Sequence, residues 1–240
     1  MSAIRTVAIM QPTYLPYLGY LDLVQRAHVF VFLDDCQFDR RSWQQRNRIL
    51  ARHGEEMLTV PVKRRPVETQ IREMEIDDAQ PWRRDHLVAL RRAYQGRPGF
   101  EDGWAFIQSG LTPKPGGRLA DVTIDLIETA ADKLGFKAER VRSSALACGG
   151  QRSHHTLAIL RKLGAERYLS PLGSRAYIEE DGVLAAAAVS VRYLSYAPIA
   201  YPQGRAGFTP YMGFIDALMN LGWAGLTAHL AEIGRQEFHD

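Results

Sequence analysis

The 240-residue chain has only two cysteines, Cys36 and Cys148, and its apolar stretches are short. Two cysteines exclude a disulfide framework and a cysteine-rich metal centre, and they fit a reducing compartment. The most apolar stretch, residues 182–191, is about half of the roughly 20 residues that a membrane-spanning helix needs. The start of the chain lacks the long apolar segment of a secretory signal. We therefore expect a cytoplasmic protein without a membrane span.

An excess of charge of one sign is also missing. The chain has 30 Lys and Arg residues and 27 Asp and Glu residues, which gives a formal net charge of +3. This charge is too small to indicate a nucleic-acid-binding protein. The basic residues are concentrated in residues 37–97, which hold 14 basic and 9 acidic side chains. This segment is either an ordinary solvated surface or a surface that receives phosphates or another anionic partner.

The familiar catalytic motifs are absent as well. The sequence contains no GxGxxG, P-loop, GxSxG, HExxH or paired CxxC pattern, so dinucleotide binding, nucleotide hydrolysis and zinc or serine hydrolysis have no sequence support. We expect neither a cofactor nor a metal site.

The hydrophobic pattern predicts an α/β fold with a Rossmann-like, mainly parallel sheet, flanking helices and a helical middle section. Short apolar runs predict strands at residues 6–10 and 28–33, joined by a helix over 18–27, which is a βαβ unit. Further strands are predicted at 57–62, 71–76, 138–143, 167–170 and 189–196. Further helices are predicted at 82–94, 103–109, 119–134, 155–163, 214–221 and 226–233, with Ser153 as an N-cap.

This alternation of predicted strands and helices indicates one α/β domain over residues 1–240. Residues 80–135 form a helical insertion or a small subdomain within it. In such sheets, ligands bind beyond the carboxyl ends of the strands, so polar residues at those ends are the candidate site.

The first such cluster follows the first predicted strand and contains Gln11, Tyr14 and Tyr17. Amide and phenol groups held by two prolines can orient a ligand, and the helix start beyond them favours an anion. The alternative is a stiff, buried loop whose polar groups are satisfied internally.

The second cluster follows the next strand and contains Asp34, Asp35 and Gln37. Carboxylates at this position accept protons from an amine or hydroxyl nucleophile, or hold a sugar hydroxyl. Since neighbouring side chains of a strand point to opposite faces, we expect one carboxylate in the site unless the strand has ended. Capping of a turn is the alternative.

Two further groups lie near predicted strand ends. Arg46 supplies a guanidinium fork, with the amide of Asn47 beside it, for phosphate or carboxylate; a surface arginine run is the alternative. Ser170, Gly173 and Tyr177 follow a strand, where small residues let a polar ligand approach the backbone; a plain turn is the alternative reading.

Histidines and cysteine offer weaker candidates. His154 and His155 are adjacent on a predicted helix and do not face each other, so we interpret them as an ordinary helix start. Cys148 has no evident base beside it and is not expected to be a nucleophile.

The segments 9–49, 58–63, 164–178 and 201–222 together resemble the WbqC-like family of bacterial proteins. The resemblance covers nearly the whole chain. It implies a role in tailoring sugar or thiotemplate intermediates, because the family occurs in gene neighbourhoods for O-antigen and other surface polysaccharides and for secondary metabolism. By position it supports residues named above and adds others: Pro12, Leu15, Pro16, Gly19, Tyr201, Pro202, Gln203 and Asp216.

The sequence departs from the family pattern at two positions. Met10 stands where family members commonly have histidine before the Gln-Pro pair, so that histidine cannot act as a base here. Ser170 is followed by Pro171 rather than by the usual glycine, which weakens a phosphate-loop interpretation.

We therefore expect a transferase that moves an acyl or aminoacyl group from an activated thioester donor to an amine or hydroxyl of a sugar-type or pathway intermediate. Asp34, Gln11 and Tyr14 are the expected catalytic residues. The residues expected to bind substrate are Tyr17, Asp35, Gln37, Arg46, Asn47, Lys63, Ser170, Gly173, Tyr177, Tyr201 and Gln203.

The partners expected are a small-molecule substrate and, for the donor, a carrier-protein thioester or a nucleotide-linked sugar. Two alternatives stay open. One is a nucleotidyl-transferring or adenylating enzyme, and the other is a non-catalytic protein that binds a carrier or a sugar intermediate.

Overall fold

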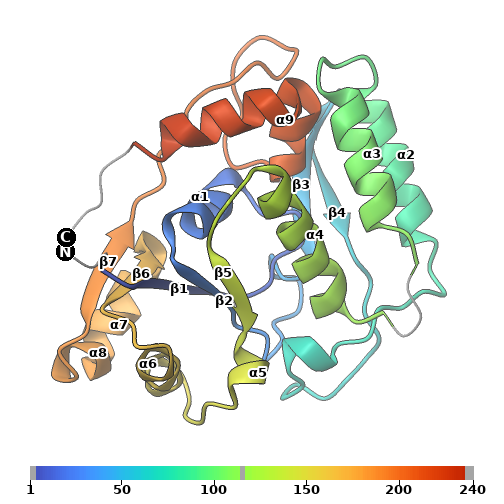
Figure 1. Cartoon of the computed structure of the whole chain (residues 1–240). Coiled ribbons are helices and arrows are strands. Elements are labelled where there is room, and N and C mark those ends of the chain that lie inside the picture. The colour runs from blue at the N-terminus through green and yellow to red at the C-terminus, as the bar shows by residue number, and fades with distance from the viewer. Residues whose placement is uncertain (1–3, 114–116, 236–240) are drawn as a thin grey trace.

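A five-stranded parallel sheet forms the centre of the molecule. The computed structural model describes residues 4–113 and 117–235, and the strand order is β5-β2-β1-β6-β7 (Figure 1). All four strand pairs are parallel. The strands are β1 (Thr6–Met10), β2 (Val29–Phe32), β5 (Glu139–Arg142), β6 (Arg167–Pro171) and β7 (Ser190–Leu194).

The strand order reverses at β1. The chain moves outward from β1 through β2 to β5, and then returns to the other side of β1 to add β6 and β7. This is the order of a Rossmann-like sheet, whose ligands bind at the carboxyl ends of the strands where the order reverses. The predicted fold class is confirmed.

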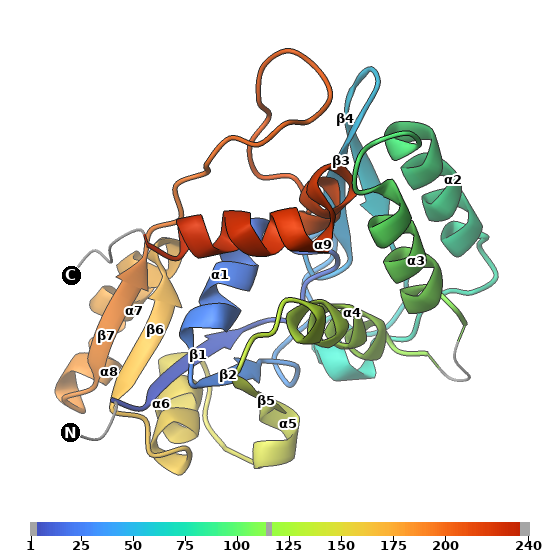
Figure 2. The same cartoon turned by 45° about the horizontal axis from the view of Figure 1, so that its top comes forward.

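Both faces of the sheet are covered, which explains why β1 and β2 are apolar throughout. Ala8 and Phe30 face one side, and Val7 and Val31 face the other. The first side packs against α1 (Leu18–Arg26), α4 (Leu119–Lys133) and α9 (Phe214–Ile233). The second packs against α6 (Ser153–Lys162), α7 (Arg175–Asp181) and α8 (Val183–Ala186). Figure 2 shows the two helical layers on opposite sides of the strands.

The middle of the chain adds a hairpin and helices beside this sheet. The antiparallel hairpin consists of β3 (Arg46–Ala51) and β4 (Gly54–Thr59), and it lies next to α2 (Trp82–Tyr94) and α3 (Phe100–Gly110) (Figure 1). Buried residues of α2, α3 and α4 belong to the same hydrophobic core as Phe30 of the sheet. None of the described helices has the length and apolar composition needed to cross a bilayer.

Three local predictions differ from the structure. The strand predicted at 57–62 is β4, shifted toward Gly54 and paired with β3, which the sequence analysis had treated as an arginine run. The strand predicted at 71–76 is wrong, because Gln70 and Glu73 form a capping box that closes the single-turn 3-10 helix η1 (Ile71–Glu73). Ser153 is not an N-cap: it is the first residue of α6, and its Oγ has no hydrogen-bond partner among the described residues.

The two C-terminal helices predicted separately form one element. α9 contains both, and Gly222 lies between them with φ 67°, a left-handed conformation that bends the helix. Two short elements complete the chain: α5 (Ser143–Leu146) and the 3-10 turn η2 (Leu172–Ser174).

Candidate functional site

Polar side chains from two strand ends and from one helix start meet at the carboxyl edge of the sheet. Asp34 and Asp35 follow β2, Ser143 and Ser144 begin α5 directly after β5, and His155 lies in the first turn of α6. Hydrogen bonds connect all five residues. We call these five residues the edge cluster.

Asp34 is the structural centre of the edge cluster. Its side chain is completely buried, and its Oδ1 accepts hydrogen bonds from the Ser143 hydroxyl (3.2 Å) and from the Ser144 backbone N–H (3.0 Å). Its Oδ2 accepts one from the Ser144 hydroxyl (2.9 Å). Both carboxylate oxygens are therefore occupied by the first residues of α5, and Asp34 ties the end of β2 to the end of β5.

Asp35 is more open and pairs with a histidine. Its Oδ1 accepts a hydrogen bond from the Ser143 hydroxyl and lies 3.1 Å from Nε2 of His155. The two side chains are 13% and 12% exposed. Nδ1 of His155 lies 3.2 Å from the Gly149 carbonyl oxygen. Both ring nitrogens thus face oxygen atoms, which fixes the orientation of the imidazole beside the carboxylate.

The second oxygen of Asp35 is the one free acceptor of this pair. Within residues 4–113 and 117–235, no hydrogen bond reaches Oδ2 of Asp35. A partly buried carboxylate with one fixed and one free oxygen, next to a histidine, has the geometry of a general base. The arrangement can accept a proton from an incoming amine or hydroxyl.

Gln11 at the end of β1 borders the edge cluster. The residue is exposed, its Nε2 donates to Sγ of Cys36 (3.3 Å), and its Oε1 accepts from Nε2 of Gln44 (2.9 Å). The amide is thereby fixed in orientation while one N–H is left to bind a ligand. Burial raises the pKa of the Cys36 thiol to about 11, so this cysteine is a neutral hydrogen-bond partner rather than a thiolate nucleophile.

Tyr14 and Asn47 lie beneath this surface. Tyr14 is fully buried, and its hydroxyl lies 2.9 Å from Nδ1 of His86. Burial raises the pKa of Tyr14 far above its usual range. Asn47 is buried too, and its Nδ2 donates to the carbonyl oxygens of Tyr14 (3.2 Å) and Leu15 (2.8 Å). Both residues hold the loop after β1 on the hairpin, and neither is brought to the edge cluster.

Tyr201 and Gln203 belong to a separate buried network. The hydroxyls of Tyr201 (2.7 Å) and Tyr94 (2.6 Å) donate to the carboxylate of Asp216, and so does Nε2 of Gln203 (3.0 Å). Burial raises the pKa of Asp216. This network joins the segment after β7 to α2 and α9, away from the edge cluster.

The end of β6 lies beside β1, at the point where the strand order reverses. Ser170 is completely buried, and its hydroxyl is bonded to the hydroxyls of Ser174 and Tyr168. Gly173 is exposed and its surroundings are open, and Tyr177 is 53% exposed. The hydroxyls of Ser170, Ser174 and Tyr168 thus bond to one another inside the protein, whereas Gly173 and Tyr177 are accessible from solvent.

Three other predicted residues flank the region. Gln37 is exposed and its backbone forms an isolated bridge with Gln70. Arg46 is half-buried at the start of β3, and its Nε is buried without a partner among the described residues. Tyr17 precedes α1 and contacts the ring of Tyr196, with centroids 5.3 Å apart.

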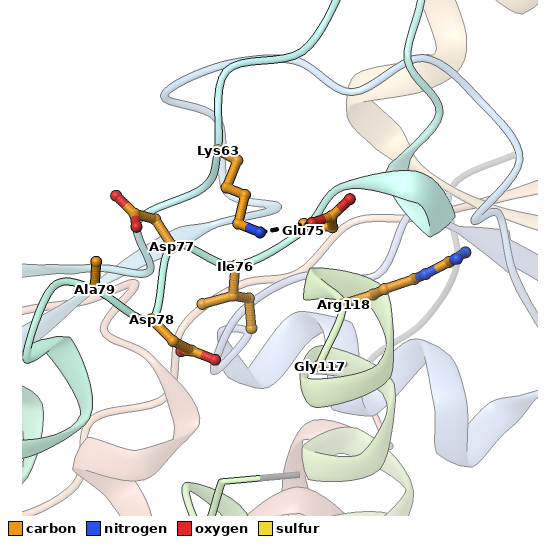
Figure 3. Close-up of a pocket in the computed structure, with 8 residues that line it drawn as sticks. All are labelled: Lys63, Glu75, Ile76, Asp77, Asp78, Ala79, Gly117 and Arg118. Carbon is orange, nitrogen blue, oxygen red and sulfur yellow. Dashed lines mark hydrogen bonds and ion pairs between the residues drawn. The ribbon is translucent and has the colours of Figure 1, made fainter. Parts of the chain in front are cut away.

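Lys63 lies in a separate surface cavity of about 530 Å³ (Figure 3). Its Nζ points to Glu75 and forms an ion pair of 2.8 Å, whereas Arg118 extends away from this pair. The side chains of Asp77 and Asp78 also line the cavity. A mixed-charge cavity of this kind has no single ligand class that it favours.

Four residues of this region were not predicted as site residues. Ser143 ends the predicted strand at 138–143 and Ser144 follows it, and that position was the available signal. His155 was interpreted as an ordinary helix start, although it opens a helix at the carboxyl edge. Gln44 carries no signal of its own, since only the fold brings it to Gln11.

Comparisons with known proteins place the chain among similar sequences. The model of the WbqC-like protein family matches residues 11–228. An uncharacterized protein of Mycobacterium tuberculosis is 27% identical over 220 residues, which are 91% of this chain and 94% of that protein. No solved structure matches.

Proposed function

Because the chain belongs to the WbqC-like protein family, we propose, from the geometry of its edge cluster, that it is an acyl- or aminoacyl-transferase. The donor is an activated thioester, and the acceptor is an amine or hydroxyl of a sugar-type or pathway intermediate. The observation that carries the proposal is the Asp35–His155 pair, which leaves Oδ2 of Asp35 free at the carboxyl edge.

In this reaction Asp35 accepts the proton of the nucleophile. Oδ1 is fixed by Ser143 and His155, so Oδ2 receives the N–H or O–H proton of the acceptor as its heavy atom attacks the thioester carbonyl carbon. The new C–N or C–O bond forms while the C–S bond breaks. The proton then passes from the Asp35–His155 pair to the departing sulfur, which leaves as a thiol.

Gln11 and Asp34 have supporting roles. The free N–H of Gln11 donates to the thioester carbonyl oxygen as negative charge develops there, because its amide is held by Cys36 and Gln44. Asp34 positions α5, and through Ser143 it fixes Asp35. We assign the proton-accepting role to Asp35 rather than Asp34, since both oxygens of Asp34 are already hydrogen-bonded.

The test is turnover measured by mass spectrometry on the full chain. Pantetheine thioesters of acetate and of glycine are offered with nucleotide-linked amino sugars, with and without ATP. We expect a new amide or ester without ATP, and a fall of about 100-fold or more in Asp35→Asn and His155→Gln. His154→Gln is the matched control, because His154 is exposed and lies next to His155 in the chain.

Three outcomes would contradict the proposal. Product formed at the parental rate by Asp35→Asn would remove the proposed base. Product that requires ATP would favour adenylation. Binding of either substrate without any product would favour a non-catalytic binding protein, and the surface-polysaccharide or secondary-metabolite role would then be one of presentation.

A further inference from the structure

An aromatic surface lies next to the proposed site. Trp43 and Tyr211 are 49% and 47% exposed, and Arg48 connects them, with its guanidinium 5.4 Å from the Trp43 ring and Nη2 donating to the Tyr211 carbonyl (3.3 Å). The Tyr211 ring contacts Tyr17 (6.3 Å) and Tyr196 (6.0 Å). We call these five side chains the aromatic strip.

The chain maintains this strip at a conformational cost. Tyr211 has φ 61°, a left-handed conformation that L residues other than glycine rarely adopt. Gly19 is required as well, because a Cβ there would lie 2.4 Å from the Tyr17 ring and 2.7 Å from the Tyr196 ring. The half-buried rings of Tyr17 and Tyr196 are thus packed tightly under the exposed ring of the strained Tyr211, and strain that holds an exposed ring indicates a surface with a function.

The composition of the strip is that of a protein interface. Trp, Tyr and Arg are the residue types that dominate binding energy between proteins. Small-molecule sites are concave. The cavity described above is lined by Lys63 and its neighbours, and no residue of the strip contributes to it. The strip therefore favours a protein partner over a small ligand.

The charge beside the strip selects an acidic partner. Residues 39–48 contain four arginines and a single acidic residue, Asp39. Arg48 is paired with Glu55, but the side chains of Arg40, Arg41 and Arg46 form no ion pair with the described residues. Arg40 and Arg41 are exposed. A carboxylate-rich protein surface would neutralise these guanidinium groups on docking.

The surface is continuous with the proposed active site. The Trp43 carbonyl oxygen accepts a hydrogen bond from the Tyr14 backbone N–H (3.1 Å). Gln44, the next residue, donates to Gln11, which borders the edge cluster. A protein docked on the strip would thus deliver a flexible attached group to the carboxyl edge.

We infer that the aromatic strip, with Arg40 and Arg41, docks an acidic carrier protein that presents the thioester donor. This inference rests on the proposed function, because it names the form in which the donor arrives. It adds that the carrier is recognised by its own surface, separately from the acyl group.

The test compares two forms of one donor. The same acyl group is offered on an acidic acyl carrier protein and on free pantetheine. In Arg40→Glu/Arg41→Glu and in Trp43→Ala we expect KM for the carrier-borne donor to rise about 10-fold or more, with KM for the pantetheine donor unchanged. Lys133→Glu/Lys137→Glu is the charge-matched control for the double variant, since both lysines are exposed and precede β5, at the amino end of that strand.

Salt and direct binding complete the test. Raising the ionic strength to about 0.15 M should weaken the use of the carrier-borne donor and leave the use of the pantetheine donor unchanged.

If the surface variants turn over both donors as the parent does, the docking inference is overturned while the proposed function stands. If neither donor is turned over, fluorescence anisotropy of the labelled carrier protein decides: binding lost in Arg40→Glu/Arg41→Glu supports docking, and no binding to the parent overturns it.

Discussion

Asp34 and Asp35 are neighbours in the chain with opposite environments. One is completely buried under three hydrogen bonds from α5, and the other keeps an open oxygen beside His155. The sequence predicts carboxylates at this strand end, but it cannot distinguish them, because the distinction is made by Ser143 and Ser144 of α5, which lie more than 100 residues further along the chain. His155 is likewise recognisable only once α6 is placed at the same edge.

The first residue-scale prediction separates stability from turnover at this pair. Asp34→Ala leaves the Ser144 N–H and hydroxyl without their acceptor, so we expect it to lower the free energy of unfolding by about 2–4 kcal/mol. Asp35→Asn should lower it by about 1 kcal/mol or less, because Oδ1 remains an acceptor for Ser143. Urea titration followed by circular dichroism measures both. Equal losses of stability would contradict the assignment of Asp34 as the structural member.

The second residue-scale prediction concerns acid sensitivity. Burial lowers the pKa of His86 from 6.5 to about 4. Below pH 6.5 the unfolded chain therefore binds a proton that the folded chain does not bind. The free energy of unfolding falls as the pH falls from 6.5 to about 4. The loss is about 3 kcal/mol. Unfolding titrations across this range should show it in the parent and not in His86→Gln.

The comparison with a variant is needed because another group acts in the opposite direction. Burial raises the pKa of Asp216, so the folded state gains stability from that carboxyl as the pH falls through its raised pKa. The contribution of Asp216 is the same in both proteins, so it cancels when the free energy of unfolding of His86→Gln is subtracted from that of the parent. A difference that does not change with pH would contradict the role given to His86.

At the scale of elements, the pattern of apolar residues is informative where a strand or helix has its own period. Residues 6–10 and 82–94 were predicted with the bounds of β1 and α2. Residues 71–76 were misjudged because their buried residues, Ile71, Met74 and Ile76, serve a turn and an isolated bridge. The hairpin partner of residues 54–59 was missed because β3 is rich in arginine, whose long side chains cover one face of the hairpin.

The bend in α9 gives an element-scale prediction. Gly222 has φ 67°, and a Cβ added there would lie 2.8 Å from Oδ2 of Asp102. Gly222→Ala should therefore lower the melting temperature, with a cost of about 1–3 kcal/mol. Gly225→Ala, in the same helix with ordinary helical φ, gains up to about 1 kcal/mol of helix propensity. Its Cβ would lie 3.0 Å from Cβ of Leu221, which opposes that gain, so we expect a net change of about 1 kcal/mol or less in either direction. Calorimetry on both variants measures the difference, and equal melting temperatures would show that the bend tolerates a side chain.

At the scale of the molecule, the βαβ pattern was sufficient to predict a parallel sheet, since strands separated by helices leave few other arrangements. It could not give the strand order or place the aromatic strip. Those depend on pairings such as Thr6 with Arg167 and Tyr17 with Gly213, which join distant parts of the chain.

The number of buried tyrosines gives a prediction for the whole molecule. Burial raises the pKa of Tyr14, Tyr20, Tyr94, Tyr168 and Tyr201. Each loses its proton in the unfolded chain near pH 10 but not in the folded one, so stability falls above pH 10 by about 1.4 kcal/mol per pH unit for each tyrosine. The tyrosinate absorbance of these five residues should rise in one cooperative step with unfolding. Tyr168→Phe should reduce the slope of stability against pH by about 1.4 kcal/mol per pH unit, and titration of these five tyrosines one by one in a folded chain would contradict the prediction.

The central position of β1 affects how the protein is made. β1 (Thr6–Met10) is synthesised before the other strands of the sheet, yet one of its two neighbours, β6, begins at Arg167, and α9, which packs on α1, is synthesised later still. Until β6 has been made, an apolar strand with an unpaired edge therefore lies beside an unfinished core. The rate of elongation and the chaperones that meet the nascent chain thus become determinants of its yield, alongside the stability of the finished fold.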